Sequence, residues 1–348
     1  MAMDRCLQVA WFDGKQAIAE QTNFIFSPLS LRAGLSLLAA GAHGATLRQL
    51  LDFLGSEHTA HLDAATAALH ARMRSWPQFA SAAASDHAAV ARSADFRSRP
   101  AAAAAEVNAF IEQATAGRIR NLIVSPDAVK GNGKVVLSNG MHFKATWARR
   151  FDPADTVHDL FHLGDGYTSV RVPFLSDAGV QYAETFDAGP GFKVLQCFYK
   201  MTNREGRLDP RAPCFCMLVF LPHRRDGLAA LLRLAVTEPD FVMRSGSTPG
   251  APFNPDDADL SRMVANAPPE GLYVSAVGVA CAVEVDEEGT TAVACMYGPT
   301  SPGYSPCDSP PPPPMSFVAD HAFMFAIVEY EKAEVLFLGH VMDPSKET

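Results

Sequence analysis

Two adjacent acids, Glu287 and Glu288, are the first candidates for a catalytic role. Paired carboxylates can act as general acid and general base when other side chains converge on the same substrate. No such partner stands near them in the sequence, and Gly289 follows directly. We therefore interpret the pair as part of a solvated hinge rather than as a catalytic dyad.

Cysteine thiols are a second candidate, either as nucleophiles or as metal ligands. They form an odd set without C-x-x-C spacing. Cys214 and Cys216 alternate along an expected strand, so both thiols would lie on one face, and we interpret them as small core residues. The full set is Cys6, Cys197, Cys214, Cys216, Cys281, Cys295 and Cys307.

The motifs of common enzymes are missing from the sequence. There is no G-x-S-x-G elbow, no HExxH helix and no Walker loop. We therefore expect no enzymatic activity, no cofactor and no bound metal.

The residues around the two acids follow a distinct order. An alternating apolar run, expected as a strand, ends at Val285; the acids and Gly289 follow, then small side chains as far as Cys295 and a proline-rich segment as far as Met315. One interpretation is a strand that ends in a solvated acidic turn with a proline-rich insert. The other is a hinge that leads into an exposed loop, because glycine supplies backbone freedom there.

This order resembles the hinge and reactive-centre loop of the serpins, and residues 284–290 are closest to plant members of that family. Three further segments resemble serpin motifs in the same order along the chain: residues 23–30, 137–147 and 317–325. In the last of these, Ala322 stands where the family pattern has proline. Together they favour the hinge interpretation and identify the chain as a shortened, divergent plant-type serpin.

The resemblance implies an α+β fold with mixed β-sheets, surrounding helices and an exposed reactive-centre loop at about residues 287–316. It also implies inhibition of a serine protease, or of a cysteine protease, as a suicide substrate. The protease attacks the loop, and the cut loop then inserts into the main sheet as a new strand and distorts the enzyme.

The family pattern also assigns site residues. Counting from Gly289 places the reactive bond between Gly303 and Tyr304, which suits an elastase-like protease, or a chymotrypsin-like one if the register slips by one residue to Tyr304. The hinge would comprise Glu287, Glu288, Gly289, Thr290, Thr291, Ala292, Val293 and Ala294. The region where the sheet opens would comprise Ser27, Ser30, Asn139 and Trp147.

Other residues argue against inhibition. Pro299 would lie inside the inserting strand and Pro302 at its end, where proline has no N–H for the ladder. Val279 occupies the position at which the family usually has a buried histidine, so the polar residues around it would lose a hydrogen-bond partner. The alternative is a non-inhibitory or degenerate serpin-fold protein that is cleaved as a substrate or serves in binding.

His158 and His162 stand four residues apart beside Asp155 and Asp159. On a helix this spacing would place both imidazoles on one face, as a metal pair requires. The surrounding residues resemble a strand connection of the family in which the histidines are ordinary surface residues. We favour the second interpretation.

The periodicity of apolar residues predicts the helices and strands of the chain. We expect helices from Ser27 to Gly41, from a Thr46/Gln49 capping box to Gly55, and over residues 101–116 and 228–236. We expect strands over residues 135–143, 192–199, 214–221, 272–285, 323–328 and 335–341. Compared with the family, we expect a missing strand near residues 75–95 and two missing strands and a helix near residues 243–260.

Composition limits the remaining possibilities. With 348 residues and 48% hydrophobic content, the chain could form one large domain or two ordinary ones. The resemblance to the serpins implies one serpin-like domain over residues 1–348, acting as a monomer. A net charge of −9 disfavours nucleic acid and anionic membranes as partners. Since the start of the chain lacks a basic region followed by an apolar core, we expect a cytosolic protein. The family resemblance also admits the extracellular space.

Overall fold

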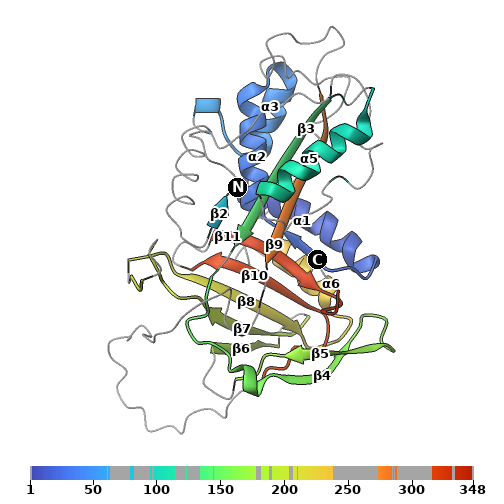
Figure 1. The fold of residues 1–348 in the computed structure, drawn as a ribbon, viewed down its shortest axis with the longest axis vertical. Helices are drawn as coiled ribbons and strands as arrows, with labels where there is room; N and C mark the ends of the chain where they lie inside the picture. Colours follow the sequence, from blue (N-terminus) through green and yellow to red (C-terminus); the bar gives the residue numbers. More distant parts are fainter. Residues whose placement is uncertain are drawn as a thin grey trace. The chain divides into compact units, whose positions relative to one another are not determined.

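The computed structural model describes most of the chain (Figure 1). The described ranges are 2–60, 79–81, 98–114, 134–143, 145–177, 182–187, 190–203, 207–209, 211–237, 273–283, 316–330 and 334–346, with the single residues Leu62, Asp95, Ile123, Val285 and Glu287.

Two compact units make up the chain, and each is assembled from three stretches of sequence. Unit 1 contains Met1–Asp13, Ile25–Phe143 and Leu234–Val283. Unit 2 contains Gly14–Phe24, Lys144–Arg233 and Glu284–Thr348. Helices α1 (Ala2–Ala19) and α6 (Leu228–Thr237) each pass from one stretch to the next. The expectation of a single domain stays a prediction.

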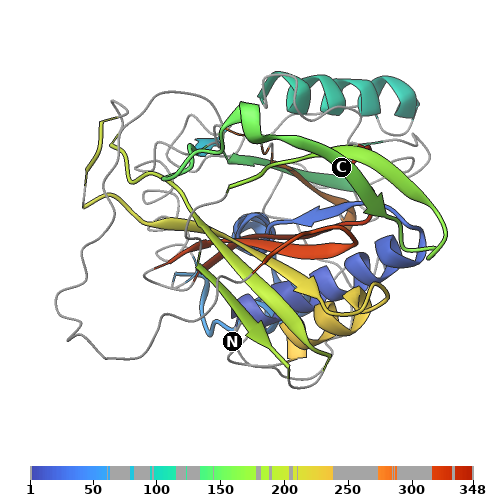
Figure 2. The same ribbon diagram turned by 90° about the horizontal axis from the view of Figure 1, so that it is seen from below.

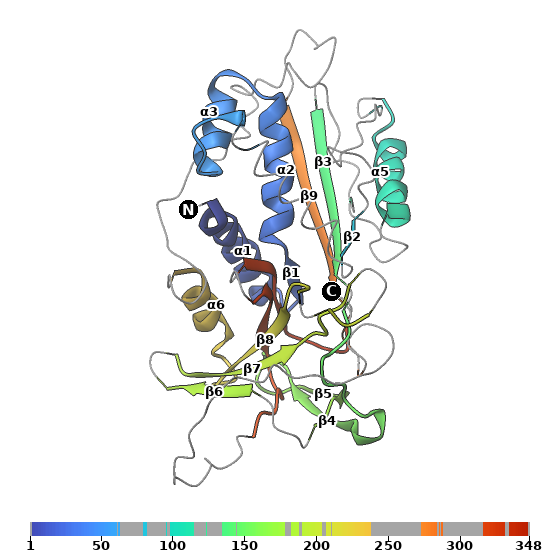
Figure 3. The same ribbon diagram turned by 90° about the vertical axis from the view of Figure 1, so that its left-hand side faces the viewer.

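Unit 1 is built around a three-stranded sheet in the order β2-β3-β9. Strands β2 (Phe79–Ser81) and β3 (Lys134–Phe143) are antiparallel, whereas β3 and β9 (Tyr273–Val283) run parallel. Helices α2 (Pro28–Gly41) and α5 (Pro100–Ala114) both contact β3, from opposite sides (Figure 3). Helix α3 (Gly44–Phe53) packs against α2.

Local sequence explains α2. The Ser27 side chain accepts a hydrogen bond from the Ser30 backbone N–H at 3.1 Å, and Pro28 occupies the first helical position, where no N–H is needed. Leu31, Leu35 and Leu38 repeat at helical spacing and are buried. The predicted end at Gly41 is confirmed.

Unit 2 contains most of a six-stranded sheet in the order β1-β11-β10-β8-β7-β6 (Figure 2). The bounds are β1 Phe24–Phe26, β6 Tyr182–Phe186, β7 Phe192–Phe198, β8 Phe215–Pro222, β10 Phe323–Glu329 and β11 Glu334–Val341. Strands β8, β10 and β11 are buried along nearly all their length, as expected for central strands covered on both faces. Gly339 is required in β11, because a Cβ there would lie 2.5 Å from the Phe24 carbonyl oxygen of β1.

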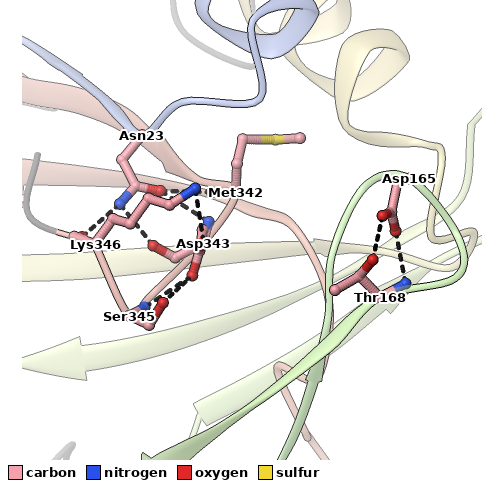
Figure 4. Close-up of polar contacts among 7 residues, drawn as sticks. All are labelled: Asn23, Asp165, Thr168, Met342, Asp343, Ser345 and Lys346. Atoms are coloured by element: carbon pink, nitrogen blue, oxygen red, sulfur yellow. Dashed lines mark hydrogen bonds and ion pairs between the residues drawn. The ribbon is translucent and has the colours of Figure 1, made fainter.

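A separate antiparallel pair, β4 (Val157–His162) and β5 (Ser169–Phe174), follows a short 3-10 helix η2 (Pro153–Asp155). Asp165 closes the hairpin turn by accepting from the backbone N–H groups of Tyr167 and Thr168 and from the Thr168 hydroxyl (Figure 4). Gly166 adopts a φ of 78°, which favours glycine.

Two sequence-based expectations are wrong. A strand is present near residues 75–95, because Phe79–Ser81 pairs with Met141, His142 and Phe143 of β3. It is only three residues long, so its own alternation carries no signal and its partner strand decides its conformation. The Thr46/Gln49 capping box is also absent: the N-cap of α3 is His43, three residues before Thr46, and it makes no side-chain cap bond. The expected losses near residues 243–260 lie outside the described residues.

Candidate functional site: the paired central strands and the root of the loop

Strands β3 and β9 form the pair that any inserting segment would have to separate. Their parallel register runs from Lys134↔Tyr273 to Phe143↔Val283, with one irregularity at Val135/Val136. Asn139 pairs with Val279 in this register. Val279 is the residue at the position where the family usually has a histidine. Separating this pair requires breaking a ladder that spans the whole of β3.

The predicted sheet-opening residues fall into two groups. Ser27 and Ser30 lie fully buried at the start of α2, the helix that contacts β3, so they share unit 1 with Asn139. Trp147 belongs to unit 2, where its ring stacks on Tyr199 at 4.5 Å and meets Phe151 edge-on at 6.2 Å. Trp147 therefore marks an aromatic cluster beside the root of the loop.

Glu287, the first hinge residue, is held by two hydrogen bonds. The backbone N–H of Phe151 donates to its carbonyl oxygen at 3.0 Å. The Thr156 hydroxyl donates to Glu287 Oε1 at 2.9 Å. Thr156 is positioned by helix η2, whose N-cap Asp152 accepts from the Ala154 N–H at 2.9 Å. The segment 151–156 thus anchors the strand-to-loop junction.

The remaining hinge and reactive-bond residues lie outside the described residues. They are Glu288, Gly289, Thr290, Thr291, Ala292, Val293, Ala294, Gly303 and Tyr304. Their roles stay predictions.

Sequence reasoning missed Phe151 and Thr156 as site residues. Thr156 is 131 residues from Glu287 along the chain, and an isolated threonine carries no motif. Trp147, at the end of the family-like motif over residues 137–147, lies four residues before Phe151, but it does not identify the hydroxyl that contacts the hinge.

Replacing Thr156 with valine should loosen the root of the loop. Valine keeps the shape but removes the hydroxyl, so the Glu287 carboxylate loses a hydrogen bond worth about 1–2 kcal/mol. We expect limited proteolysis between residues 288 and 315 to become about fivefold faster, measured by mass spectrometry of timed samples. Thr168→Val is the matched control, since that hydroxyl bonds Asp165 in the β4–β5 turn. Equal rates in all three proteins would show that the contact does not restrain the loop.

Burial raises the pKa of three of the cysteine thiols that the structure describes. Burial raises the pKa of the Cys6 thiol to about 12, opposed by the charge of Arg32, and burial together with Asp177 raises that of Cys197 to about 12. Burial also raises the pKa of the Cys216 thiol, so these cysteines are protonated core residues. His158 and His162 lie on strand β4, not on a helix, and His162 Nδ1 bonds the Ser169 hydroxyl at 2.9 Å.

Within the described part of the chain, no group of three or more histidine, cysteine or acidic side chains could hold a metal ion. None of the described helices combines the length and apolar character needed to cross a membrane.

Comparison with known proteins identifies the family. The family model described as serpin (serine protease inhibitor) matches residues 12–78, 62–241 and 249–344. A rice (Oryza sativa subsp. japonica) protein named as non-inhibitory serpin-10 is 56% identical, with 99% of this chain and 100% of the relative covered. Another rice protein, named as non-inhibitory serpin-Z11, is 49% identical over the same shares of the two chains.

A solved structure agrees with the sequence matches. The Arabidopsis serpin AtSerpin1, in its native stressed conformation, superposes with a TM-score of 0.77 at 25% identity, and 99% of each chain is covered. The parallel β3–β9 pair, the loop root at Glu287 and these matches over nearly the whole length lead to one conclusion: the chain belongs to the serpin family.

Proposed function

We propose that this chain is a non-inhibitory serpin, whose loop a protease cleaves as an ordinary substrate without being trapped. Pro299 and Pro302 carry this proposal. A cut loop that starts at Gly289 would have to join the sheet between β3 and β9, where each inserted residue needs an N–H for the ladder. Proline supplies none, so each would leave a strand carbonyl without its donor, at a cost of about 1–3 kcal/mol.

The register of the central strands supports the same proposal. Val279 stands opposite Asn139, and valine has no side-chain donor or acceptor to exchange with a polar neighbour while the strands part. The names of the two rice relatives, both of which describe non-inhibitory serpins, agree with it.

Suicide inhibition of a serine protease is the second candidate. Its support is the hinge composition: Gly289 is followed by Thr290, Ala292 and Ala294 at alternate positions, and such small side chains fit between a sheet and its covering helices. A protease is the partner in both candidates, so an experiment has to distinguish cleavage from trapping.

Incubation with an elastase-like and with a chymotrypsin-like protease makes this distinction. We expect cleavage near Gly303 or Tyr304, no covalent complex on a denaturing gel, and full recovery of protease activity. We also expect the cleaved protein to melt no higher than the intact protein, because the loop does not become a strand. A denaturant-stable complex that forms with the unmodified chain, and disappears in Thr290→Arg while cleavage persists, would establish inhibition instead.

A further inference from the structure

His321 is a buried histidine with a hydrogen-bond acceptor at each ring nitrogen. It is 7% exposed and lies two residues before strand β10. Its Nδ1 atom is 2.6 Å from Asp320 Oδ1, and its Nε2 atom is 2.8 Å from the carbonyl oxygen of Pro222, the last residue of β8. Carboxylate and carbonyl oxygens accept hydrogen bonds and do not donate them. Both ring nitrogens must therefore donate if both contacts are to be favourable.

A neutral imidazole cannot make both of these contacts. It carries one N–H, so either tautomer leaves a bare ring nitrogen facing an oxygen lone pair at 2.6 Å or 2.8 Å. Two buried acceptors that face each other are unfavourable, because a buried place offers no solvent to supply the missing donor. An imidazolium donates from both nitrogens, and its bond to the carboxylate is charge-assisted. The geometry thus favours the charged ring.

The charged groups nearby agree with an ionised Asp320 carboxylate. Arg225 Nη2 is 3.9 Å from Asp320 Oδ2, so the second carboxylate oxygen faces a cation. The neighbouring titratable and charged side chains contact other groups: His162 bonds the Ser169 hydroxyl at 2.9 Å, His223 lies 3.8 Å from Asp187, and Arg224 pairs with Asp226 at 2.8 Å. Asp320 is therefore the charge that the His321 ring contacts directly.

The contacts of Asp320 and His321 join three stretches that are far apart in sequence. His321 binds the end of β8 through the Pro222 carbonyl. The carbonyl oxygen of Asp320 accepts from the backbone N–H of His162, the last residue of β4, at 2.8 Å. All three stretches belong to unit 2. The segment that leads into β10 is thereby tied to the ends of two other strands.

We propose that His321 is a pH-sensitive catch: as an imidazolium it ties the segment before β10 to the end of β8, and the loss of one ring proton weakens that tie. A neutral ring keeps one of the two bonds, and the other contact becomes a repulsion between acceptors. The contribution of the catch to stability is fully present below about pH 6.5, where a histidine in the unfolded chain is protonated as well. It decreases as the pH rises above that value. The inference does not depend on whether a protease cleaves the loop or is trapped by it.

NMR of protein with isotope-labelled histidine ring nitrogens tests the charge directly. At about pH 7.5 we expect one ring to carry hydrogen on both nitrogens, and we expect its signals to vanish in His321→Gln. In Asp320→Asn the same ring should carry one hydrogen, because the asparagine amide can donate to Nδ1 while Nε2 still donates to Pro222. This variant also identifies the ring if His321→Gln fails to fold. A bare nitrogen in the His321 ring of the unmodified protein overturns the proposal, and so does a ring that keeps both hydrogens in Asp320→Asn.

Thermal unfolding at different pH values tests the effect of the catch on stability. We expect the unfolding midpoint of the unmodified protein to exceed that of His321→Gln at about pH 6, and the difference to shrink by about 2–4 °C as the pH rises to about 9. His158→Gln is the control for the chemistry of the substitution, because His158 is exposed on β4. If His321→Gln does not fold, Asp320→Asn gives the same comparison, since it removes the charge that holds the second ring proton. A difference that stays constant or grows over this range overturns the catch.

Discussion

Replacing Asn23 with alanine should lower the free energy of unfolding by about 4 kcal/mol, from four hydrogen bonds of about 1 kcal/mol each. Asn23 Nδ2 donates to the carbonyl oxygens of Asp343 and Lys346, both at 2.8 Å. Its Oδ1 accepts from the backbone N–H groups of Met342 and Asp343, both at 2.9 Å (Figure 4). One side chain thus uses its full donor and acceptor capacity to hold a segment about 320 residues away.

The loss should be large because alanine leaves these backbone groups without a partner, and three of the four contacts are partly buried. Chemical denaturation followed by tryptophan fluorescence measures it. Asn108→Ala is the matched control: Asn108 makes two hydrogen bonds, both to Ile123, and should cost about half as much. If the two substitutions cost the same, the four contacts of Asn23 do not act as a clamp on the end of the chain.

Elements with strong local signals could be predicted from the sequence. Ser27 and Pro28 define the start of α2 through a cap and a fixed φ, and both effects act within one turn. Strands β3, β7, β8, β9, β10 and β11 are long apolar runs, and the structure places each within two residues of its predicted bounds. The α+β fold of the serpins is likewise confirmed.

Elements that depend on distant partners could not be predicted in this way. The first four residues of β4 are exposed, so the sequence there has no alternation of apolar and polar residues. They form a strand because they pair with β5 across the turn at Asp165. The same limit applies to the site. Glu287 could be identified from the order of residues around Gly289, whereas its partners Phe151 and Thr156 lie more than 130 residues earlier and become visible only when the chain is folded.

A buried histidine predicts how stability depends on pH. His340 in β11 is fully buried, with its ring 5.5 Å from that of Phe24. Nε2 donates to the Thr22 carbonyl oxygen at 3.2 Å, and Nδ1 is buried without a partner. Burial lowers the pKa of His340 from 6.5 to about 4, and the bond to Thr22 offsets only part of this effect. The folded protein therefore keeps this imidazole neutral.

The sign of the effect follows from proton binding. Above pH 6.5 the histidine is neutral in the folded and the unfolded chain, and its contribution to stability is fully present. As the pH falls from 6.5 towards 4, His340 binds a proton in the unfolded chain but not in the folded chain. The free energy of unfolding therefore decreases. The difference between the two pKa values corresponds to a loss of about 3 kcal/mol once the pH is below about 4.

Comparison of the unmodified protein with His340→Gln over pH 4–7 isolates this contribution, since both proteins share every other titrating group. Glutamine keeps an Nε2 donor for the Thr22 carbonyl and cannot be protonated in this range. We expect the variant to be less stable at pH 7, because it loses the packing of the imidazole on Phe24. We expect the difference in free energy of unfolding between the two proteins to shrink by about 3 kcal/mol as the pH falls to 4. His158→Gln is the control for the chemistry of the substitution, because His158 is exposed on β4. A gap between His340→Gln and the unmodified protein that stays constant across this range would mean that His340 takes up its proton in the folded chain as readily as in the unfolded one.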